Sequence, residues 1–166
     1  MRPLTRRTRA LVAIALTCLA VLAVSAPTTA APAQAVHIVS PVTFDPNGNH
    51  GTFDASGAAV EAGLICARGT FVDTGLAFHG FQSGHAVQIY VGKTFTCPGA
   101  GTFDVKLQIN ASFDGTERFA WSITGGSGAY ANLRGAGTGS TVPTFDPDDP
   151  ENQIGNVNTY DGMLTR

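Results

Sequence analysis

The feature that most constrains the fold is a two-residue alternation of apolar and polar side chains in the second half of the chain. In residues 103–110, Phe, Val, Leu and Ile alternate with Asp, Lys, Gln and Asn, and residues 117–124 alternate in the same way. Successive side chains of a strand point to opposite faces, so this period predicts half-buried β-strands. Asp114-Gly115, between the two segments, is typical of a hairpin turn. Beyond residue 60 no useful stretch has the helical period, so we expect an all-β fold.

Further segments complete the set of expected strands. They lie at 64–73, 76–82, 85–97 and 156–164, with a strand of small residues near 135–142. Within the third of these segments, Gly92 indicates a β-bulge or bend. Seven or eight mostly antiparallel strands favour a single closed barrel, which leaves no exposed edge strand. A two-sheet sandwich is the alternative, because strand count and alternation do not separate the two architectures.

The N-terminal segment has the composition of a secretion signal. Four arginines within residues 2–9 precede an uncharged apolar run at 10–24, and an A-x-A cleavage site ends at Ala35. The apolar run is shorter than the roughly 20 residues that span a bilayer. We therefore expect a secreted, extracellular product without stable membrane insertion. The expected parts of the chain are a cleaved signal helix at 1–35, an N-terminal arm at 36–50 and a β-barrel domain at 51–166.

Removal of this signal changes the charge of the chain. It contains four of the ten basic residues and none of the twelve acidic residues, so the formal net charge falls from −2 to −6. A chain this acidic is not expected to bind nucleic acid. All 20 glycines and all 10 phenylalanines remain, which indicates one glycine-punctuated domain with an aromatic core.

Two of the three cysteines, Cys66 and Cys97, lie in the expected mature chain, whereas Cys18 lies in the signal. In an oxidising compartment an even number of cysteines indicates a disulfide. The 31-residue separation corresponds to roughly 3–4 kcal/mol of stabilisation in the chain-entropy model. No C-x-x-C motif is present, and the histidines do not lie at zinc-ligand spacing with either cysteine. We therefore expect a structural disulfide, no metal and no cofactor.

A glycine-rich turn, followed by a strand of small residues, carries a family resemblance. The turn runs Gly125-Gly126-Ser127-Gly128-Ala129-Tyr130, and it resembles the turn of the allene oxide cyclase barrel-like group, which is related to plant dirigent proteins. Residues 62–66, 93–97 and 160–162 look like the secreted actinobacterial branch, and the resemblance spans roughly 51–166. It implies an eight-stranded, calycin-like barrel with an apolar lumen, two cysteines that face each other, and a homo-oligomer. No catalytic residue is carried over to this chain.

Two further motifs have a structural interpretation. Gly125, Gly126 and Gly128 permit positive φ and close packing, and Tyr130 can plug a barrel end. The turn lacks the Lys and Ser/Thr of a phosphate loop and the spacing of a nucleophile elbow. An acidic stretch near the C-terminus offers oxygen ligands for calcium but lacks the glycine of a calcium loop, so we interpret it as solvated. Its weak candidate ligands are Asp146, Asp148, Asp149 and Glu151.

The remaining candidate site is the barrel interior. Some of the aromatic side chains on the long strands must face inward, where they form either a filled core, which small barrels favour, or a pocket. The ligand-binding candidates are Tyr90, Phe95, Phe103, Phe119 and Trp121. The leading hypothesis is a non-catalytic protein that binds an apolar small molecule or an extracellular partner. The alternatives are a lyase or isomerase that acts by shape in the lumen, and a structural protein with a filled core.

Overall fold

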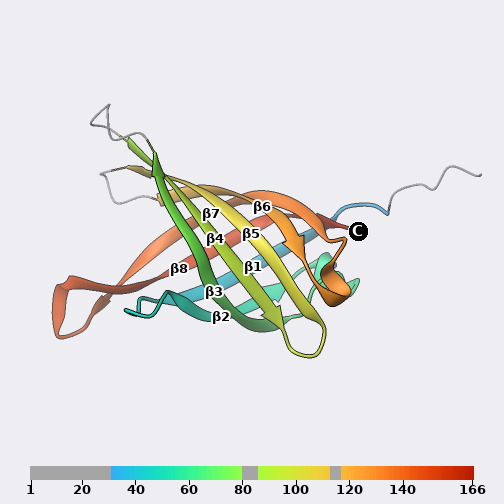
Figure 1. Ribbon diagram of the computed structural model, residues 1–166, viewed down its shortest axis with the longest axis horizontal. Coiled ribbons are helices and arrows are strands. Elements are labelled where there is room, and N and C mark those ends of the chain that lie inside the picture. Colours follow the sequence, from blue (N-terminus) through green and yellow to red (C-terminus); the bar gives the residue numbers. More distant parts are fainter. Residues whose placement is uncertain (1–30, 80–85, 113–116) are drawn as a thin grey trace, which may run out of the picture.

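The computed structural model describes residues 31–79, 86–112 and 117–166, which form a closed barrel of eight antiparallel strands (Figure 1). Each strand pairs with its neighbours in sequence, and β8 pairs with β1 to close the barrel. The strands are β1 (Gln34–Thr43), β2 (His50–Ser56), β3 (Arg68–His79), β4 (Ala86–Cys97), β5 (Gly101–Ser112), β6 (Glu117–Gly126), β7 (Arg134–Asp146) and β8 (Asp149–Thr165). The expected all-β barrel is confirmed, and the sandwich alternative is excluded because its sheets do not close.

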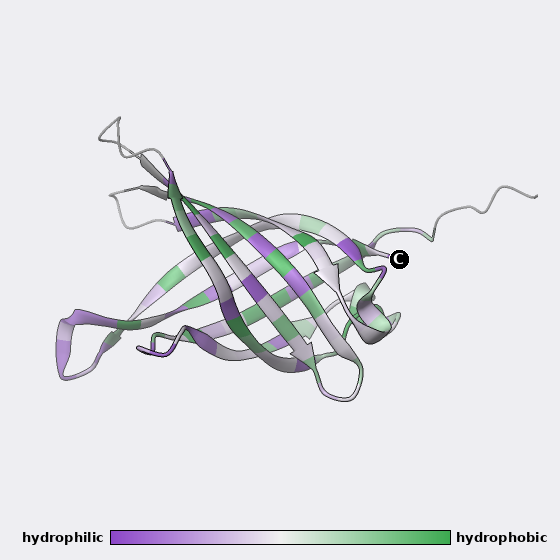
Figure 2. Ribbon diagram, in the orientation of Figure 1, coloured by the Kyte–Doolittle hydropathy of each residue, from purple (hydrophilic) through white to green (hydrophobic). Residues whose placement is uncertain are grey.

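The alternation in the sequence is visible along the barrel wall. Figure 2 shows hydrophobic and hydrophilic residues following one another along the strands, with a hydrophilic tip on the β7–β8 hairpin. Residues 36–50, expected to form an arm, contain most of β1, which pairs with both β2 and β8 in the wall. Residues 1–30 of the expected signal at 1–35, and the Asp114-Gly115 turn, lie outside the described residues, while Gln34 and Ala35 at the end of that segment belong to β1.

The predicted bulge at Gly92 is wrong, because the irregularity lies in the neighbouring strand. The β3–β4 register shifts between Asp73 and Gly75, so Thr74 is the extra residue, and it belongs to β3. The β4–β5 register is continuous through Gly92. Val91, Lys93, Phe95 and Cys97 are all buried, so β4 keeps one inward phase. The inward-facing lysine alone interrupts the apolar pattern of these buried side chains.

Aromatic rings fill one half of the barrel interior, which we call the aromatic half. Phe95 is stacked on Phe103 with ring centroids 5.0 Å apart, and Phe119 packs on Tyr160 at the same distance. Offset-stacked and edge-to-face pairs of this kind stabilise a core beyond the area that they bury. The buried aromatic residues are Phe53, Phe71, Phe95, Phe103, Phe119, Trp121, Tyr130 and Tyr160.

Glycines at the paired positions of neighbouring strands make room for two of these rings, because Gly139 pairs with Phe119 and Gly69 with Phe53. A Cβ at Gly139 of β7 would overlap the ring of Phe119, and a Cβ at Gly69 of β3 would approach the ring of Phe53 to 2.7 Å. An interior packed at normal density has no space for both atoms. The interior therefore accepts these two rings because the residue paired with each of them on the neighbouring strand has no side chain.

The barrel end beside the aromatic half carries the short helices α1 (Ala58–Glu61) and η1 (Gly128–Tyr130), close to the C-terminus (Figure 1). The disulfide between Cys66 and Cys97, with Cα atoms 5.9 Å apart, joins the segment after α1 to the end of β4, as expected. Tyr130 contacts the ring of Phe103 with centroids 5.8 Å apart. Gly128 has a φ of +57°, a conformation that glycine adopts without strain. The glycine-rich turn thus brings Tyr130 onto the core.

The helices of this fold are short. Within residues 31–79, 86–112 and 117–166, no helix is long and apolar enough to cross a membrane.

Candidate functional site

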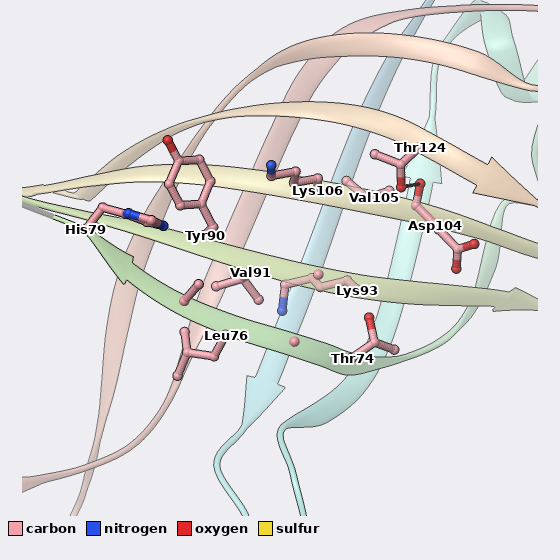
Figure 3. Close-up of a pocket in the computed structure, with 13 residues that line it drawn as sticks. Thr74, Leu76, His79, Tyr90, Val91, Lys93, Asp104, Val105, Lys106 and Thr124 are labelled. Atoms are coloured by element: carbon pink, nitrogen blue, oxygen red, sulfur yellow. Dashed lines mark hydrogen bonds between the residues drawn. The ribbon is translucent and has the colours of Figure 1, made fainter.

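Two hollows of the barrel differ in character, because one lies on its outer surface and the other opens into the lumen. The outer groove, of about 630 Å³, lies on the outer face of β3, β4 and β5 (Figure 3). Its floor is the pair Gly75 and Gly92, which face each other across the β3–β4 ladder and leave the backbone bare. The groove therefore owes its depth to missing side chains.

Polar groups along the outer groove are engaged with one another. The amine of Lys106 lies 4.7 Å from the centre of the Tyr90 ring, and the ring of His79 packs edge-on against it at 5.3 Å. The Thr94 hydroxyl donates a hydrogen bond of 2.6 Å to Asp104. Tyr90, a ligand-binding candidate, thus lines the outer groove and faces away from the lumen.

The second hollow, which we call the lumen cavity, lies in the half of the interior that the rings leave unfilled. Its volume is about 220 Å³. Phe44, Asn49 and Gln153 line it, which places its mouth at the end from which the β7–β8 hairpin projects (Figure 1). Its apolar lining is Val42, Ile89, Val91, Leu107 and Ile109, and its further polar lining is Asp73, Lys93, Glu117, Thr141, Asn156 and Asn158.

A buried ion pair forms one side of the lumen cavity. Lys93 is only 3% exposed, and its Nζ lies 2.5 Å from a carboxylate oxygen of Asp73. The side-chain amide of Asn49 donates to the other oxygen of Asp73 at 3.1 Å, and the ring of Phe71 lies 4.6 Å from the Lys93 amine. Burial lowers the pKa of Lys93, an effect that the carboxylate of Asp73 opposes. The register shift between Asp73 and Gly75 places Thr74 as an extra residue directly after Asp73, and the side chain of Asp73 faces the lumen.

The facing side of the lumen carries neutral polar groups from β1, β7 and β8. The Thr141 hydroxyl donates to Asn158 Oδ1 at 2.9 Å, and the Asn158 amide donates to the Tyr160 hydroxyl at 3.5 Å. Burial raises the pKa of Tyr160, which therefore stays protonated at neutral pH. Among the described residues, the buried oxygen Asn156 Oδ1 has no hydrogen-bond partner. An unpaired buried polar group is costly, so this side has unused hydrogen-bonding capacity.

The other four ligand-binding candidates lie in the aromatic half. Phe95, Phe103, Phe119 and Trp121 face inward, and each is at most 4% exposed. They pack against one another and against Tyr160, and they do not line the lumen cavity. They belong to the packed half of the interior, next to the cavity.

Sequence reasoning missed the polar residues of the lumen. The one local signal was Lys93, a charged residue in phase with the apolar residues of its strand. Asn156 and Asn158 share a face of β8 with Tyr160 and gave a weaker signal. The remaining lining residues come from distant parts of the chain, and only barrel closure brings them together.

The acidic candidates for calcium lie at the tip of the β7–β8 hairpin. Asp146 accepts a hydrogen bond of 2.9 Å from the backbone of Asp148, and Asp149 accepts one of 3.3 Å from Glu151. Carboxylates in such turns stabilise the local backbone. In the part of the chain that the structure describes, no three His, Cys, Asp or Glu side chains are placed together to hold a metal ion.

Comparisons of the chain with protein-family models, with curated proteins and with solved structures give no match. The resemblance to the allene oxide cyclase barrel-like group therefore stays an interpretation of the sequence motifs. The chemistry of the lumen is the basis for the functional argument.

Proposed function

We propose that this chain is a secreted barrel protein that binds a compact small molecule in the lumen cavity. The observation that carries the proposal is an unfilled cavity of about 220 Å³ lined by apolar side chains on one part and by buried polar groups on another. Ligand sites commonly combine an apolar wall with a few polar groups that fix orientation. A filled core would have neither the space nor the polar lining.

The size of the cavity limits the ligand. At about 30 Å³ for each water molecule in the liquid, the cavity corresponds to roughly seven waters. Typical small-molecule sites hold roughly 300–1,000 Å³. We therefore expect a molecule with a single ring or a short branched chain, whose apolar body lies against Val91 and Leu107.

The charges of the lumen limit the polar head of the ligand. Lys93 and Asp73 neutralise each other, and a further ion buried beside them would lose its hydration without a partner. A neutral head with a carbonyl or hydroxyl oxygen is instead able to accept from the Lys93 ammonium. A hydroxyl head is also able to donate to Asn156 Oδ1, a buried oxygen without a partner that belongs to the cavity lining.

Secretion is part of the proposal. The Cys66–Cys97 disulfide supports it, because disulfides persist in oxidising compartments and are rare in reducing ones. The composition of residues 1–35 supports it independently.

Binding is tested by titrating ¹⁵N-labelled protein with a panel of compact neutral alcohols, phenols and ketones. We expect saturable shifts of the amide signals of Leu107 and Asn158, and little change at Tyr90. A Val91→Phe substitution places a ring in the cavity and should weaken binding, with Ile109→Phe as a second filling variant. Tyr90→Leu, the neighbouring position on the outer face, is the matched control and should leave binding intact. Shifts that map to the outer groove, or that survive both filling variants, would contradict the proposal.

A further inference from the structure

The chain contains only two lysines, and the barrel wall separates them. Lys93 faces the lumen and is 3% exposed. Lys106 is exposed on the outer face, where its amine lies over the Tyr90 ring. Figure 3 shows the amine of Lys106 beside Tyr90, while the amine of Lys93 points away from that ring toward β3. The fold thus provides one enclosed amine and one solvated amine in the same molecule.

The surroundings of Lys93 are those of a reactive amine. A carboxylate oxygen of Asp73 lies 2.5 Å from its Nζ and is able to take a proton from it. Asn49 holds the other oxygen of this carboxylate and so fixes its orientation. Lysines act as nucleophiles when burial makes the neutral amine accessible at moderate pH, and burial lowers the pKa of Lys93. An apolar wall borders the space next to this amine.

We propose that Lys93 captures a compact aldehyde or ketone in the lumen cavity as a Schiff base, with Asp73 as the proton carrier. This inference rests on the proposed function, because the carbonyl compound must first enter the cavity. Two contacts in the structure carry it: Lys93 lines the cavity, and its amine touches a carboxylate.

The reaction is balanced without a further reagent. The Lys93 ammonium gives a proton to Asp73, and the nitrogen lone pair then forms a bond to the carbonyl carbon. The carbonyl oxygen takes up two protons, one returned by Asp73 and one lost by the Lys93 nitrogen after it has added, and the oxygen leaves as water. The products are a protonated imine at Lys93 and one water molecule.

The charge balance of the lumen favours this product. The imine cation takes the position of the ammonium, so Asp73 keeps a positive partner and the net charge of the buried site does not change. A buried carboxylate without a counter-ion would be strongly unfavourable. The apolar lining from Val91 and Leu107 surrounds the new bond on the cavity side and limits the access of water that would hydrolyse it.

Reductive trapping tests the proposal. The folded, oxidised protein is incubated with benzaldehyde and cyanoborohydride, which reduces an imine to a stable secondary amine, and the labelled site is found by peptide mapping. We expect one benzyl group on Lys93, attached faster than on Lys106, because Lys93 lines the cavity that holds the aldehyde and its amine contacts the proton carrier Asp73. Lys106→Met should leave this labelling unchanged, and Lys93→Met should abolish it.

Two controls keep the result interpretable. Asp73→Asn retains the lysine but removes the proton carrier, so trapping at Lys93 should slow while labelling of Lys106 is unaffected. An unchanged rate at Lys93 would exclude the role of Asp73.

Benzyl alcohol, the second control, has nearly the same shape as benzaldehyde but forms no imine. If it shifts the lumen amides while benzaldehyde labels only Lys106 and the terminal amine, the Schiff base is refuted and the binding proposal stands. If benzyl alcohol, benzaldehyde and the wider panel all leave the lumen unaffected, both proposals fail.

Discussion

The two halves of the barrel interior are built from the same strands but follow different rules. In β4, Phe95 belongs to the aromatic half, whereas Lys93, two residues earlier, belongs to the lumen cavity. In β8, Tyr160 packs among rings, whereas Asn158 lines the cavity. A step of two residues along one strand therefore separates a region packed for stability from a region with polar groups and free space.

This difference shows which half of the interior contributes less to the stability of the fold. Rings in edge-to-face and stacked contact stabilise the aromatic half. The cavity half instead holds an ion pair, which apolar residues of similar volume would often match or exceed in stability. It also holds a buried oxygen, Asn156 Oδ1, without a partner. Selection for stability alone would fill this half, which supports a role for it in binding.

The substitution with the largest expected effect on the free energy of unfolding lies in the aromatic half. Phe95→Ala removes a ring with no exposed surface that contacts four other rings. We expect the free energy of unfolding to fall by about 4 kcal/mol, from the lost burial and the cavity left behind. Denaturant titration measures it, with the exposed Val142→Ala as a control that should change little. A loss below 1 kcal/mol would mean that this half is not the stabilising region.

The disulfide next to the aromatic half ranks second. Replacing both Cys66 and Cys97 by serine should lower the free energy of unfolding by roughly 3–4 kcal/mol, because the unfolded chain regains the freedom of the closed loop. Denaturation of wild type with and without reductant provides the matched comparison. An unchanged midpoint in both experiments would contradict the structural role of the bridge.

The ion pair gives the test that separates the two halves most clearly. Asp73→Leu leaves the Lys93 amine buried without a partner and should cost about 2 kcal/mol, less than the roughly 3–5 kcal/mol of a fully buried pair because Asp73 retains some solvent contact. The double variant Asp73→Leu with Lys93→Met should recover this loss, since two apolar side chains replace the pair. A double variant as unstable as the single one would show that the pair is needed for the fold.

The smallest expected effect is on pH dependence. Because burial lowers the pKa of Lys93, the unfolded chain binds more protons than the native one in the window between that lowered pKa and the ordinary value of about 10.5. The stability of wild type relative to Lys93→Met should therefore rise with pH through this window and be flat below it. Asp73 and Glu117 also face the cavity, and burial raises the pKa of Tyr160, so its hydroxyl stays protonated through this window. If the stability of wild type relative to Lys93→Met instead fell with pH, the pKa of Lys93 would be raised in the folded protein, and burial would not be the dominant cause.

The barrel was predictable from the sequence, but the cavity was not. Strand alternation is a local property, so residues 103–110 and 117–124 were sufficient to indicate a β-fold. The glycine-rich turn and the two cysteines then narrowed the range of expected β-folds to a barrel with one disulfide. The lumen residues gave no such signal, because Asp73 and Lys93 come together only when β3 pairs with β4, and Asn158 joins them only when the barrel closes. Lys93 is in phase with Val91 and Phe95, but the prediction of a β-bulge or bend at Gly92 left this charged residue on an apolar face without an interpretation.

Pairing between sequence neighbours has a consequence for the order of assembly. Seven of the eight ladders join consecutive strands, and only the β1–β8 ladder joins the two ends of the described chain. The entropy lost in closing a loop rises with its length, so we expect the local hairpins to form first and the β1–β8 seam to form last. Until that seam forms, β1 and β8 are open edges that can recruit another chain. The lumen cavity exists only after this final step, so a folding intermediate with an open seam is unable to hold a ligand.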